Sequence, residues 1–415
     1  MYYERIMLGG VLLAGTIKMI KNNCHKTECA DHLLGFMNKA EMEKVLHFHK
    51  SIPGYEPTPL VGLNALAKKL GLKNIYIKDE SHRFGLNAFK VLGGSYAIAK
   101  YVSKLVGCDV SEMDYARLTS TELRDEIGQI TFFSATDGNH GRGIAWAANK
   151  FGQKSVIFMP KGSTQYRLEK IRGEGADAFI IEGNYDDAVR LAVSEAAKAP
   201  GSIVVQDTAW DGYEEIPTWI MQGYATLALE ANEQLNVDNA APTHVFVQAG
   251  VGSFASAAQG YFTNVYGDNC PVVTVMEPDA VDCIYRSAEA GHYSVIEGDT
   301  RTIMAGLNCG SPNTISWEIL KNKTNFFLKA PDWVAAKGMR MLSSPLPGDA
   351  RVISGESGAV GAGVVAAIMQ KPEMEEYRRQ LGLDENSVVL LFSTEGDTDP
   401  GKYEDIVWDG EYSSI

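Results

Sequence analysis

The stretch "QITFFSATDGNHGRGIAWAANKFGQKSVIFMP", residues 129–160, decides the fold class of this chain. Its β-rich run at 129–135 predicts a strand, the amphipathic run at 141–151 predicts a helix, and 155–160 predicts a second strand. A strand, a helix and a strand in this order imply two parallel neighbours in one sheet, joined by a helical crossover. The stretch therefore predicts an α/β fold.

The alternation continues along the chain in two series. The first series predicts helices at 164–175 and 185–199 and strands at 176–183 and 202–208. After a long connection, the second series predicts strands at 244–250, 272–278 and 387–393 and a helix at 254–262. We therefore expect two units of mostly parallel sheet flanked by helices, with a cleft between them. Ligands of open α/β sheets bind beyond the carboxyl ends of the strands, so the loops that follow strands are the candidate sites.

The composition limits the partners of this protein. A chain of 415 residues is long enough for two domains, and 38 basic against 52 acidic residues give a net charge of −14. Such a charge argues against nucleic acid as a partner. No run of 18 apolar residues occurs, so we expect no membrane-spanning segment.

The cysteines and the N-terminus suggest a compartment. The six cysteines show no disulfide framework, and "CHKTEC" at 24–29 lacks a second ligand pair, so we expect an incidental loop and no metal. The apolar run "IMLGGVLLAG" at 6–15 lacks a clear cleavage site, so we expect a dispensable leader and a cytoplasmic protein.

One lysine lies in an apolar, glycine-rich setting: Lys90 in "FGLNAFKVLGG", residues 84–94. No acidic residue of that stretch can pair with it. An amine buried there must lose its proton or find a special partner. A surface lysine could instead lay its stem along the apolar neighbours and keep its head in water. The stretch alone leaves both interpretations open.

Two loops that follow predicted strands carry polar groups at their tips. In "SATDGNHGRG" (134–143), three glycines accompany Asp137 and Asn139, either of which could simply cap the next helix. In "STEGDTDPG" (393–401), the hydroxyls of Ser393 and Thr394 come directly after the strand and are well placed to reach a ligand. We expect the acidic residues behind them to form a surface turn.

A third loop, "QAGVGSFASAAQG" at 248–260, opens a helix with glycines, which is the geometry that binds phosphate at a helix N-terminus. Gly250, Gly252 and Ala255 also fit the dinucleotide fingerprint, and Glu277 follows where an acidic residue would hold a ribose hydroxyl. A nicotinamide- or flavin-dependent oxidoreductase is therefore one alternative for this chain.

One cofactor uses a buried lysine, a phosphate cradle and neutral hydrogen-bond donors together: pyridoxal phosphate. Its aldehyde needs a lysine amine, and its phosphate needs a glycine-rich loop at a helix N-terminus. Lys90 and residues 250–254 supply these, and Asn139 with Ser393 or Thr394 supplies partners for the ring. A dinucleotide enzyme has no comparable use for Lys90, which places that alternative second.

The chain resembles the fold type II pyridoxal-phosphate enzymes of the tryptophan synthase β-like family, and among them the diaminopropionate ammonia-lyases. The resemblance covers most of residues 46–415, whereas residues 1–45 match poorly and are expected to be an N-terminal extension. It rests on the motifs "YEPTPL", "FGLNAFKVLGG", "TDGNHGRGIAWAA", "MPKGS", "VVQDTAW", "IPTWIMQGYATLA", "QAGVGS", "DCIYRS", "IMAGLNCG", "ISGESGAVG" and "STEGDTD".

The resemblance implies a domain organisation and an assembly. Residues 46–89 and 213–415 would form a large cofactor-binding domain, and residues 90–212 a smaller, mobile one. The protein would be a homodimer. Cys283 and Cys309 lie in two loops expected near the mouth of the site, and whether they pair stays open, because a cytoplasmic chain favours free thiols.

The resemblance also implies cofactor contacts. Lys90 would be the Schiff-base lysine, and Asn139 would bond the phenolic oxygen. Ser393 or Thr394 would face the ring nitrogen, and a hydroxyl there implies a largely unprotonated ring. The phosphate cradle would consist of Gly250, Val251, Gly252, Ser253 and Phe254.

The implied reaction is α,β-elimination of 2,3-diaminopropionate, in its D and L forms, to pyruvate and two molecules of ammonia. Lys90 would act as base on one face, and Asp137 would take the proton of the D isomer. Asp207 would orient the β-ammonium group. Both aspartates stand where serine or threonine dehydratases usually have neutral residues, so the extra ammonium gives them a purpose.

Two further alternatives remain. One is a serine or threonine dehydratase, or a β-replacement synthase, on the same fold, and the two extra carboxylates argue against it. The other is a non-catalytic binding protein, against which the intact Lys90 argues.

Overall fold

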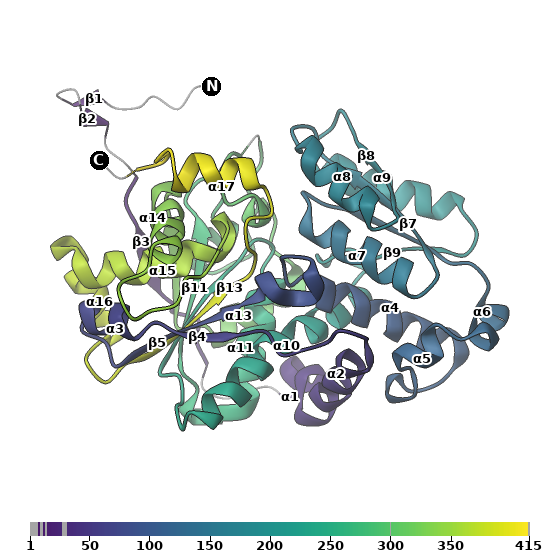
Figure 1. Cartoon of the computed structure of the whole chain (residues 1–415), viewed down its shortest axis with the longest axis horizontal. Coiled ribbons are helices and arrows are strands. Elements are labelled where there is room, and N and C mark those ends of the chain that lie inside the picture. Colours follow the sequence, from purple (N-terminus) through teal and green to yellow (C-terminus); the bar gives the residue numbers. More distant parts are fainter. Residues whose placement is uncertain (1–6, 9–10, 13–14, 27–30, 299, 414–415) are drawn as a thin grey trace.

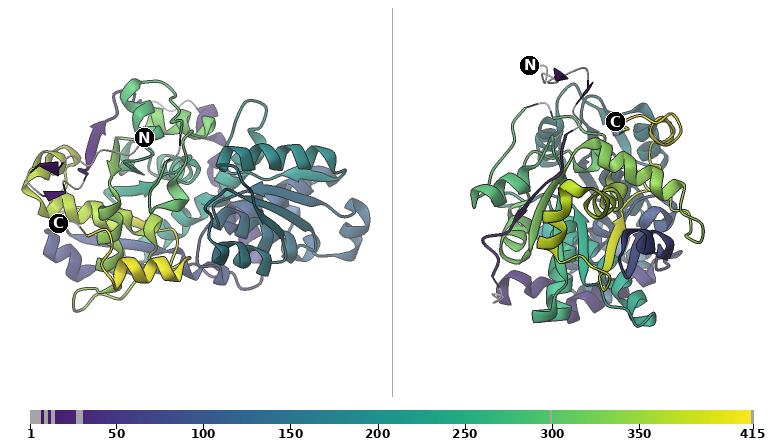
Figure 2. Two further views of the ribbon diagram at one scale, coloured as in Figure 1. Left: turned by 90° about the horizontal axis from the view of Figure 1, so that it is seen from above. Right: turned by 90° about the vertical axis from the view of Figure 1, so that its left-hand side faces the viewer.

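The computed structural model describes residues 7–8, 11–12, 15–26, 31–298 and 300–413. Apart from a short hairpin of β1 (Met7–Leu8) and β2 (Val11–Leu12), its strands form two sheets, which lie in separate lobes (Figures 1 and 2). The apolar run at 6–15 and the loop at 24–29 lie partly outside the described residues.

The larger sheet has seven strands with a parallel centre and two antiparallel edges. In spatial order these are β3 (Lys18–Lys21), β12 (Phe326–Ala330), β11 (Val272–Pro278), β10 (His244–Gln248), β13 (Val388–Ser393), β5 (Asn74–Asp79) and β4 (Leu60–Gly62). The edge strand β3 comes from the N-terminal 45 residues, which match no motif. Part of that extension is therefore built into the sheet.

Helices cover both faces of the larger sheet, as a parallel sheet requires. In β10, Val245 and Val247 join the core on one face while Phe246 joins the core on the other, because successive side chains of a strand point to opposite faces. The first face carries α10 (Glu215–Val237), α11 (Ser253–Tyr266) and α13 (Thr314–Lys323). The second carries α3 (Asn64–Leu70), α14 (Asp332–Ser343), α15 (Glu356–Gln370), α16 (Glu375–Leu381) and α17 (Pro400–Val407).

The smaller sheet has four parallel strands in the order β8 (Asp177–Ile180), β7 (Lys154–Met159), β6 (Thr131–Ala135) and β9 (Ser202–Val204). One face packs against α9 (Tyr185–Lys198), and the other against α7 (Asn139–Lys150) and α8 (Gln165–Gly173). The predicted α/β class and its helix–strand alternation are confirmed, and the element ends differ from prediction by a few residues. The remaining helices are α1 (Asp31–Leu34), α2 (Lys39–Ser51), α4 (Val91–Val106), α5 (Tyr115–Leu118), α6 (Thr121–Ile127) and α12 (Cys283–Ala290).

Helix α4 packs against α10 of the larger lobe and α7 of the smaller lobe (Figure 1), and glycines let these two helices approach it closely. A Cβ on Gly223 of α10 would lie 2.4 Å from Leu92 O, and a Cβ on Gly143 of α7 would lie 2.8 Å from Val91 N. Both distances are far below van der Waals contact, so only glycine fits at either position. These contacts fix the start of α4, and with it Lys90, against both lobes.

Among the described residues, no helix is both long and apolar enough to cross a membrane.

Candidate active site

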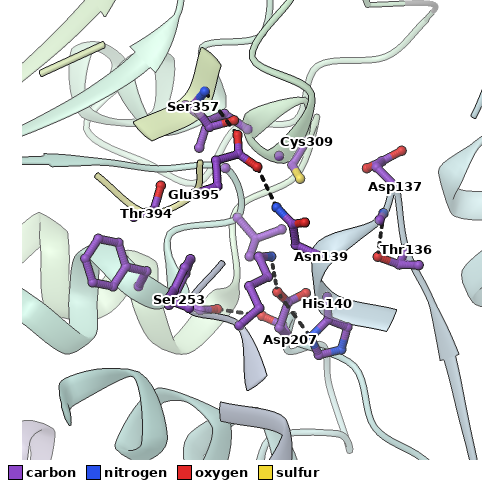
Figure 3. Close-up of a pocket in the computed structure, with 18 of the residues that line it drawn as sticks. Thr136, Asp137, Asn139, His140, Asp207, Ser253, Cys309, Ser357, Thr394 and Glu395 are labelled. Carbon is purple, nitrogen blue, oxygen red and sulfur yellow. Dashed lines mark hydrogen bonds and ion pairs between the residues drawn. The ribbon is translucent and has the colours of Figure 1, made fainter. Parts of the chain in front are cut away.

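A cavity of about 850 Å³, including its open mouth, is lined by residues of both lobes. It is lined by the loops that follow β6, β9, β10 and β13 and by the residue that begins α4. All three loops singled out in the sequence therefore meet in one place (Figure 3).

Lys90 is the N-cap residue of α4, and its side chain is 21% exposed within this cavity. Its Nζ lies 2.5 Å from Oδ2 of Asp207, which is 117 residues further along the chain. Burial opposes the charge on the amine, but the Asp207 carboxylate outweighs burial and raises the pKa of Lys90. Lys90 is thus a cavity lysine with a special partner, and the surface interpretation is wrong.

Asp207 is held on several sides. Tyr224 OH donates to its Oδ2 at 3.3 Å, and the His140 ring lies 3.7 Å from the same oxygen. Its backbone carbonyl accepts a hydrogen bond of 2.5 Å from the Ser253 hydroxyl. Burial alone would raise the pKa of the Asp207 carboxyl, yet His140 and Lys90 hold it well below its usual range. This carboxylate is the ion partner of Lys90 (Figure 3).

The loop after β6 leaves the start of α7 uncapped. The N-cap residue is Gly138, with a φ of 158°, and no side chain accepts a hydrogen bond from the first turn. The interpretation of Asp137 or Asn139 as a simple helix cap is therefore wrong. Burial raises the pKa of Asp137 to about 6, against the pull of Arg167 and Lys90. The loop presents a basic carboxylate and the first turn of α7, which has no side-chain cap, to the cavity.

Asn139 reaches across the cavity to the larger lobe. Its Nδ2 donates to Oε2 of Glu395 at 2.5 Å, and Oε1 of Glu395 accepts from the Ser357 backbone N–H at 3.2 Å. Glu395 is only 4% exposed. The expected acidic surface turn is therefore wrong for this residue, which forms part of the cavity wall.

The loop after β10 forms a cradle at the start of α11. Gly252 is the N-cap with a φ of 95°, and no side chain caps this helix either. A Cβ on Gly250 would lie 3.1 Å from Gly306 O and 3.2 Å from the Cys309 sulfur, so the backbone approaches its neighbours closely. Val251, Ser253 and Phe254 line the cavity beside the two glycines. An uncapped helix start with bare glycines fits a phosphate.

The hydroxyls of Ser393 and Thr394, the two candidate partners of the cofactor ring nitrogen, point in different directions. Ser393 Oγ donates to Ser354 Oγ at 2.7 Å, and Ser393 is not among the residues that line the cavity. Thr394 does line the cavity, and its Oγ1 accepts a hydrogen bond of 2.9 Å from Gln248 Nε2. The Thr394 hydroxyl is therefore the one within reach of a ligand.

Backbone hydrogen bonds tie the segment that carries Lys90 to the segment that carries Thr394. Phe89 N donates to Thr394 O at 3.2 Å, and Gly396 N donates to Asn87 O at 3.0 Å. Asn87 adopts a φ of 59°, which non-glycine residues seldom do, and its side chain donates to Asp397 at 2.9 Å. The amine and the hydroxyl that face the cavity are thus positioned together.

Pyridoxal phosphate fits these residues. The cavity offers an amine on Lys90, an uncapped glycine cradle for the phosphate, and the Thr394 hydroxyl. Ser357 Oγ also lies in the cavity wall as a buried hydroxyl without a hydrogen-bond partner among the described residues. A ligand with polar ring substituents would satisfy such a group.

A dinucleotide does not use this cavity in the way that the fingerprint implied. Glu277 accepts backbone hydrogen bonds from Ile284 at 2.9 Å and from Tyr285 at 2.6 Å, at the start of α12. Its side chain is buried there and does not line the cavity. The Glu277 carboxylate, which was expected to bind a ribose hydroxyl, therefore accepts hydrogen bonds from the first turn of α12 instead.

Several residues of the cavity wall were not assigned a role from the sequence: Arg167, Tyr185, Tyr224, Gln248, Cys309, Ser357 and Glu395. All of these except Arg167 and Tyr185 stand inside motifs that carry the family resemblance, so position within a motif was the available signal. Arg167 and Tyr185 stand in ordinary helix-start sequences and carry no such signal.

The two cysteines expected near the mouth are neighbours. Cys309 lines the cavity, and Cys283 Sγ lies 3.2 Å from the Cys309 carbonyl oxygen. Both thiols are free in the structure. Burial raises the pKa of Cys309 to about 12, so neither the geometry nor the ionisation marks it as a nucleophile.

Comparison with known proteins identifies the class. The sequence profile of the family "Pyridoxal-phosphate dependent enzyme" matches residues 52–394. Threonine deaminase isoform 2 from Solanum lycopersicum has the same fold, with a TM-score of 0.72 at 17% identity, covering 96% of this chain and 98% of the other. The architecture is therefore that of a fold type II pyridoxal-phosphate enzyme.

Closer relatives narrow the class. Diaminopropionate ammonia-lyase from Salmonella typhimurium is 51% identical over 91% of this chain and 94% of its own length. The holo crystal structure of the Escherichia coli enzyme has a TM-score of 0.90 at 46% identity, covering 97% of this chain and 99% of the other. A structure of that enzyme with an aminoacrylate–PLP azomethine reaction intermediate has a TM-score of 0.88 at 46% identity, covering 96% and 98%. This chain belongs to the diaminopropionate ammonia-lyase family of pyridoxal-phosphate-dependent enzymes.

Proposed function

We propose that this protein is a carbon–nitrogen lyase that converts 2,3-diaminopropionate into pyruvate and two molecules of ammonia. The observation that carries the proposal is Lys90 paired with Asp207 above an uncapped glycine cradle. The 51% identity to a diaminopropionate ammonia-lyase supports the same substrate.

Pyridoxal phosphate, when bound, draws electrons away from the substrate Cα and so makes its hydrogen acidic. The chain's own residues must hold the cofactor, orient the amino acid and move protons. The N–H groups at the start of α11 are suited to hold the phosphate, and those at the start of α7 are suited to the substrate carboxylate. Both helix starts lack side-chain caps and are open to the cavity.

Lys90 is the proposed base on one face of the substrate. Asp207 keeps this amine aimed into the cavity from 2.5 Å away. Such a contact occupies the carboxylate, which leaves it badly placed to orient the β-ammonium as well. We therefore assign Asp207 to positioning Lys90.

Asp137 is the proposed second base. Its carboxyl lines the cavity and, with a pKa raised to about 6, is a stronger base than an exposed aspartate. When a base removes the Cα proton, the electron pair forms the Cα–Cβ double bond and the Cβ–N bond breaks. Ammonia leaves, and water hydrolyses the resulting 2-aminoacrylate to pyruvate and a second ammonia.

A substrate panel tests the proposal. The protein loaded with pyridoxal phosphate is incubated with D- and L-2,3-diaminopropionate, L-serine, L-threonine and O-acetylserine with sulfide. We expect one pyruvate and two ammonia from diaminopropionate, at a kcat/KM at least about 100-fold above that for serine. A higher kcat/KM for serine or threonine, or cysteine formation, would assign the protein to the dehydratases or the β-replacement synthases.

Domain organisation is a further part of the proposal. We propose a large domain of residues 46–89 and 213–415 and a small, mobile domain of 90–212, which agrees with the four-stranded sheet lying within 131–204. Because β3 pairs with β12, residues 18–21 belong with the large domain.

The proposal also covers the assembly of the protein and its compartment. We propose a homodimer of this 45.2-kDa chain, which light scattering after size exclusion would test as twice that mass. The free thiols of Cys24, Cys108, Cys270, Cys283 and Cys309 support a reducing compartment such as the cytoplasm.

A further inference from the structure

Gln248 is a buried amide directly behind the Thr394 hydroxyl. It is the last residue of β10 and is 2% exposed. Its Nε2 lies 2.9 Å from Phe392 O, 3.0 Å from Ser357 O and 2.9 Å from Thr394 Oγ1. Three acceptors therefore share the two protons of one amide group.

The two carbonyl oxygens settle which end of the amide faces them. A carbonyl can only accept, so the NH₂ end of Gln248 must point at Phe392 O and Ser357 O. The same nitrogen contacts Thr394 Oγ1, and an amide nitrogen does not accept a hydrogen bond. The Thr394 oxygen is thus the acceptor in that contact, and its own proton must point elsewhere.

The cavity is a direction that is open to that proton. Thr394 lines the cavity, whereas the neighbouring Ser393 hydroxyl donates to Ser354 Oγ at 2.7 Å and is turned away. A hydroxyl is a free rotor and would otherwise present either its proton or a lone pair to a ligand. Gln248 occupies one of the two lone pairs of this oxygen and offers its proton no acceptor, so the proton is left for an acceptor in the cavity.

We propose that Gln248 is a positioning residue that turns the Thr394 O–H proton toward the ring nitrogen of pyridoxal phosphate. The inference rests on the proposed function and on Thr394, the one of the two candidate hydroxyls that lines the cavity, as the ring-nitrogen partner. A donor facing the nitrogen stabilises its neutral form and disfavours its protonated form, since two protons cannot share one hydrogen bond. Gln248 therefore sets the protonation state of a cofactor atom that it does not touch.

Two variants of Gln248 reverse this arrangement in different ways. Gln248→Glu keeps the size and shape of the side chain but carries at most one proton for the three acceptors, so Thr394 would donate to it and offer the ring a lone pair. Gln248→Met supplies no proton and leaves two buried carbonyls without a donor, which draws the Thr394 proton toward them. Both changes should favour a protonated ring nitrogen.

The measurement is the 15N chemical shift of the ring nitrogen in protein loaded with 15N-labelled pyridoxal phosphate, recorded across the pH range of stability. We expect the unaltered protein to give the unprotonated value, and both Gln248 variants to move toward the protonated value. We further expect kcat to fall roughly 10-fold with a small change in KM. Ser354→Ala is the matched control, because it removes the partner of the Ser393 hydroxyl and should leave the nitrogen signal in place.

Thr394→Val separates the two assignments. A signal that moves in Thr394→Val but stays in both Gln248 variants would overturn the role of Gln248 while keeping Thr394 as the ring partner. No movement in Thr394→Val, or movement in Ser354→Ala, would overturn the Thr394 assignment and the inference that rests on it.

Discussion

The buried Lys78 and the partly buried Lys90 stand twelve residues apart and have opposite surroundings. Lys78 is 0% exposed, and its Nζ lies within hydrogen-bond distance of Glu230 at 2.7 Å, Thr58 O at 2.7 Å and Gln234 at 2.8 Å. Lys90 is 21% exposed and has one hydrogen-bond partner among the described residues, Asp207. All three N–H protons of Lys78 therefore have acceptors. Lys90 has N–H protons that face the cavity and have no acceptor among the described residues.

The charges around the two lysines differ as well. Lys78 belongs to a buried network with Arg83, Glu80 and Glu230, in which two cations meet two anions. Burial lowers the pKa of Lys78 in spite of Glu230 and Glu80, but the pKa of Lys90 is raised by Asp207. Burial of a lysine therefore does not identify a reactive amine. What identifies it is an incomplete set of partners beside an open space.

Replacing each lysine by methionine gives the largest expected contrast. Lys90→Met should abolish covalent attachment of the cofactor and lower kcat by at least roughly 1,000-fold, because no other described lysine lines the cavity. The visible absorbance of the loaded protein and pyruvate release measure the two effects. Retained absorbance and turnover would mean that another lysine bonds the cofactor.

Lys78→Met should act on stability instead. Removing one cation from the closed network leaves Glu230 with too little positive charge, which should lower the free energy of unfolding by about 3 kcal/mol. Urea unfolding measures the loss, and kcat of the folded fraction should stay close to that of the unaltered protein. If Lys78→Met lost turnover as strongly as Lys90→Met, the contrast between the two sites would be wrong.

Asp137→Asn tests whether Asp137 is the base for one isomer of the substrate in the cavity that contains Lys90. If Lys90 serves one face of the substrate and Asp137 the other, turnover of D-diaminopropionate should fall roughly 100-fold and that of the L isomer much less. Pyruvate release from each enantiomer measured separately gives the answer. Because no side chain caps α7, asparagine should leave the helix start intact. Equal losses for both isomers would instead assign Asp137 to binding the β-ammonium.

The pH dependence of the same reaction provides an independent test. A carboxylate acts as base only when ionised, and the pKa of Asp137 is about 6. The ratio of D- to L-isomer kcat/KM should therefore be constant above that pH and fall about 10-fold per unit below it. A ratio that did not change with pH would remove Asp137 from the proton transfer.

The smallest expected effect is the response to NAD. Glu277 accepts backbone hydrogen bonds at the start of α12 and does not line the cavity. Calorimetric titration should therefore detect no binding of NAD, whereas pyridoxal phosphate should bind. Binding of NAD in the cavity, with displacement of pyridoxal phosphate, would restore the dinucleotide alternative.

Much of the fold and several site residues could be predicted from local patterns in the sequence. The alternation of strands and helices predicts two parallel sheets because hydrophobic periodicity is a local property. The loops after β6, β10 and β13 could be picked out because ligands of such sheets bind where strands end. The motif around Lys90 and the glycines at 250 and 252 could also be recognised in the sequence. Close approach of the backbone demands glycine, so such positions are marked by residue type.

The tertiary structure decided which of these groups have partners. The Lys90 amine meets a carboxylate 117 residues away, and Asn139 meets Glu395 at a separation of 256 residues. Nothing local distinguishes Ser393 from Thr394, and the choice follows from Ser354 and Gln248, which other elements bring to them. Hydrogen bonding and desolvation act through space, so the direction of a hydroxyl or the charge of an amine follows from neighbours that only folding supplies.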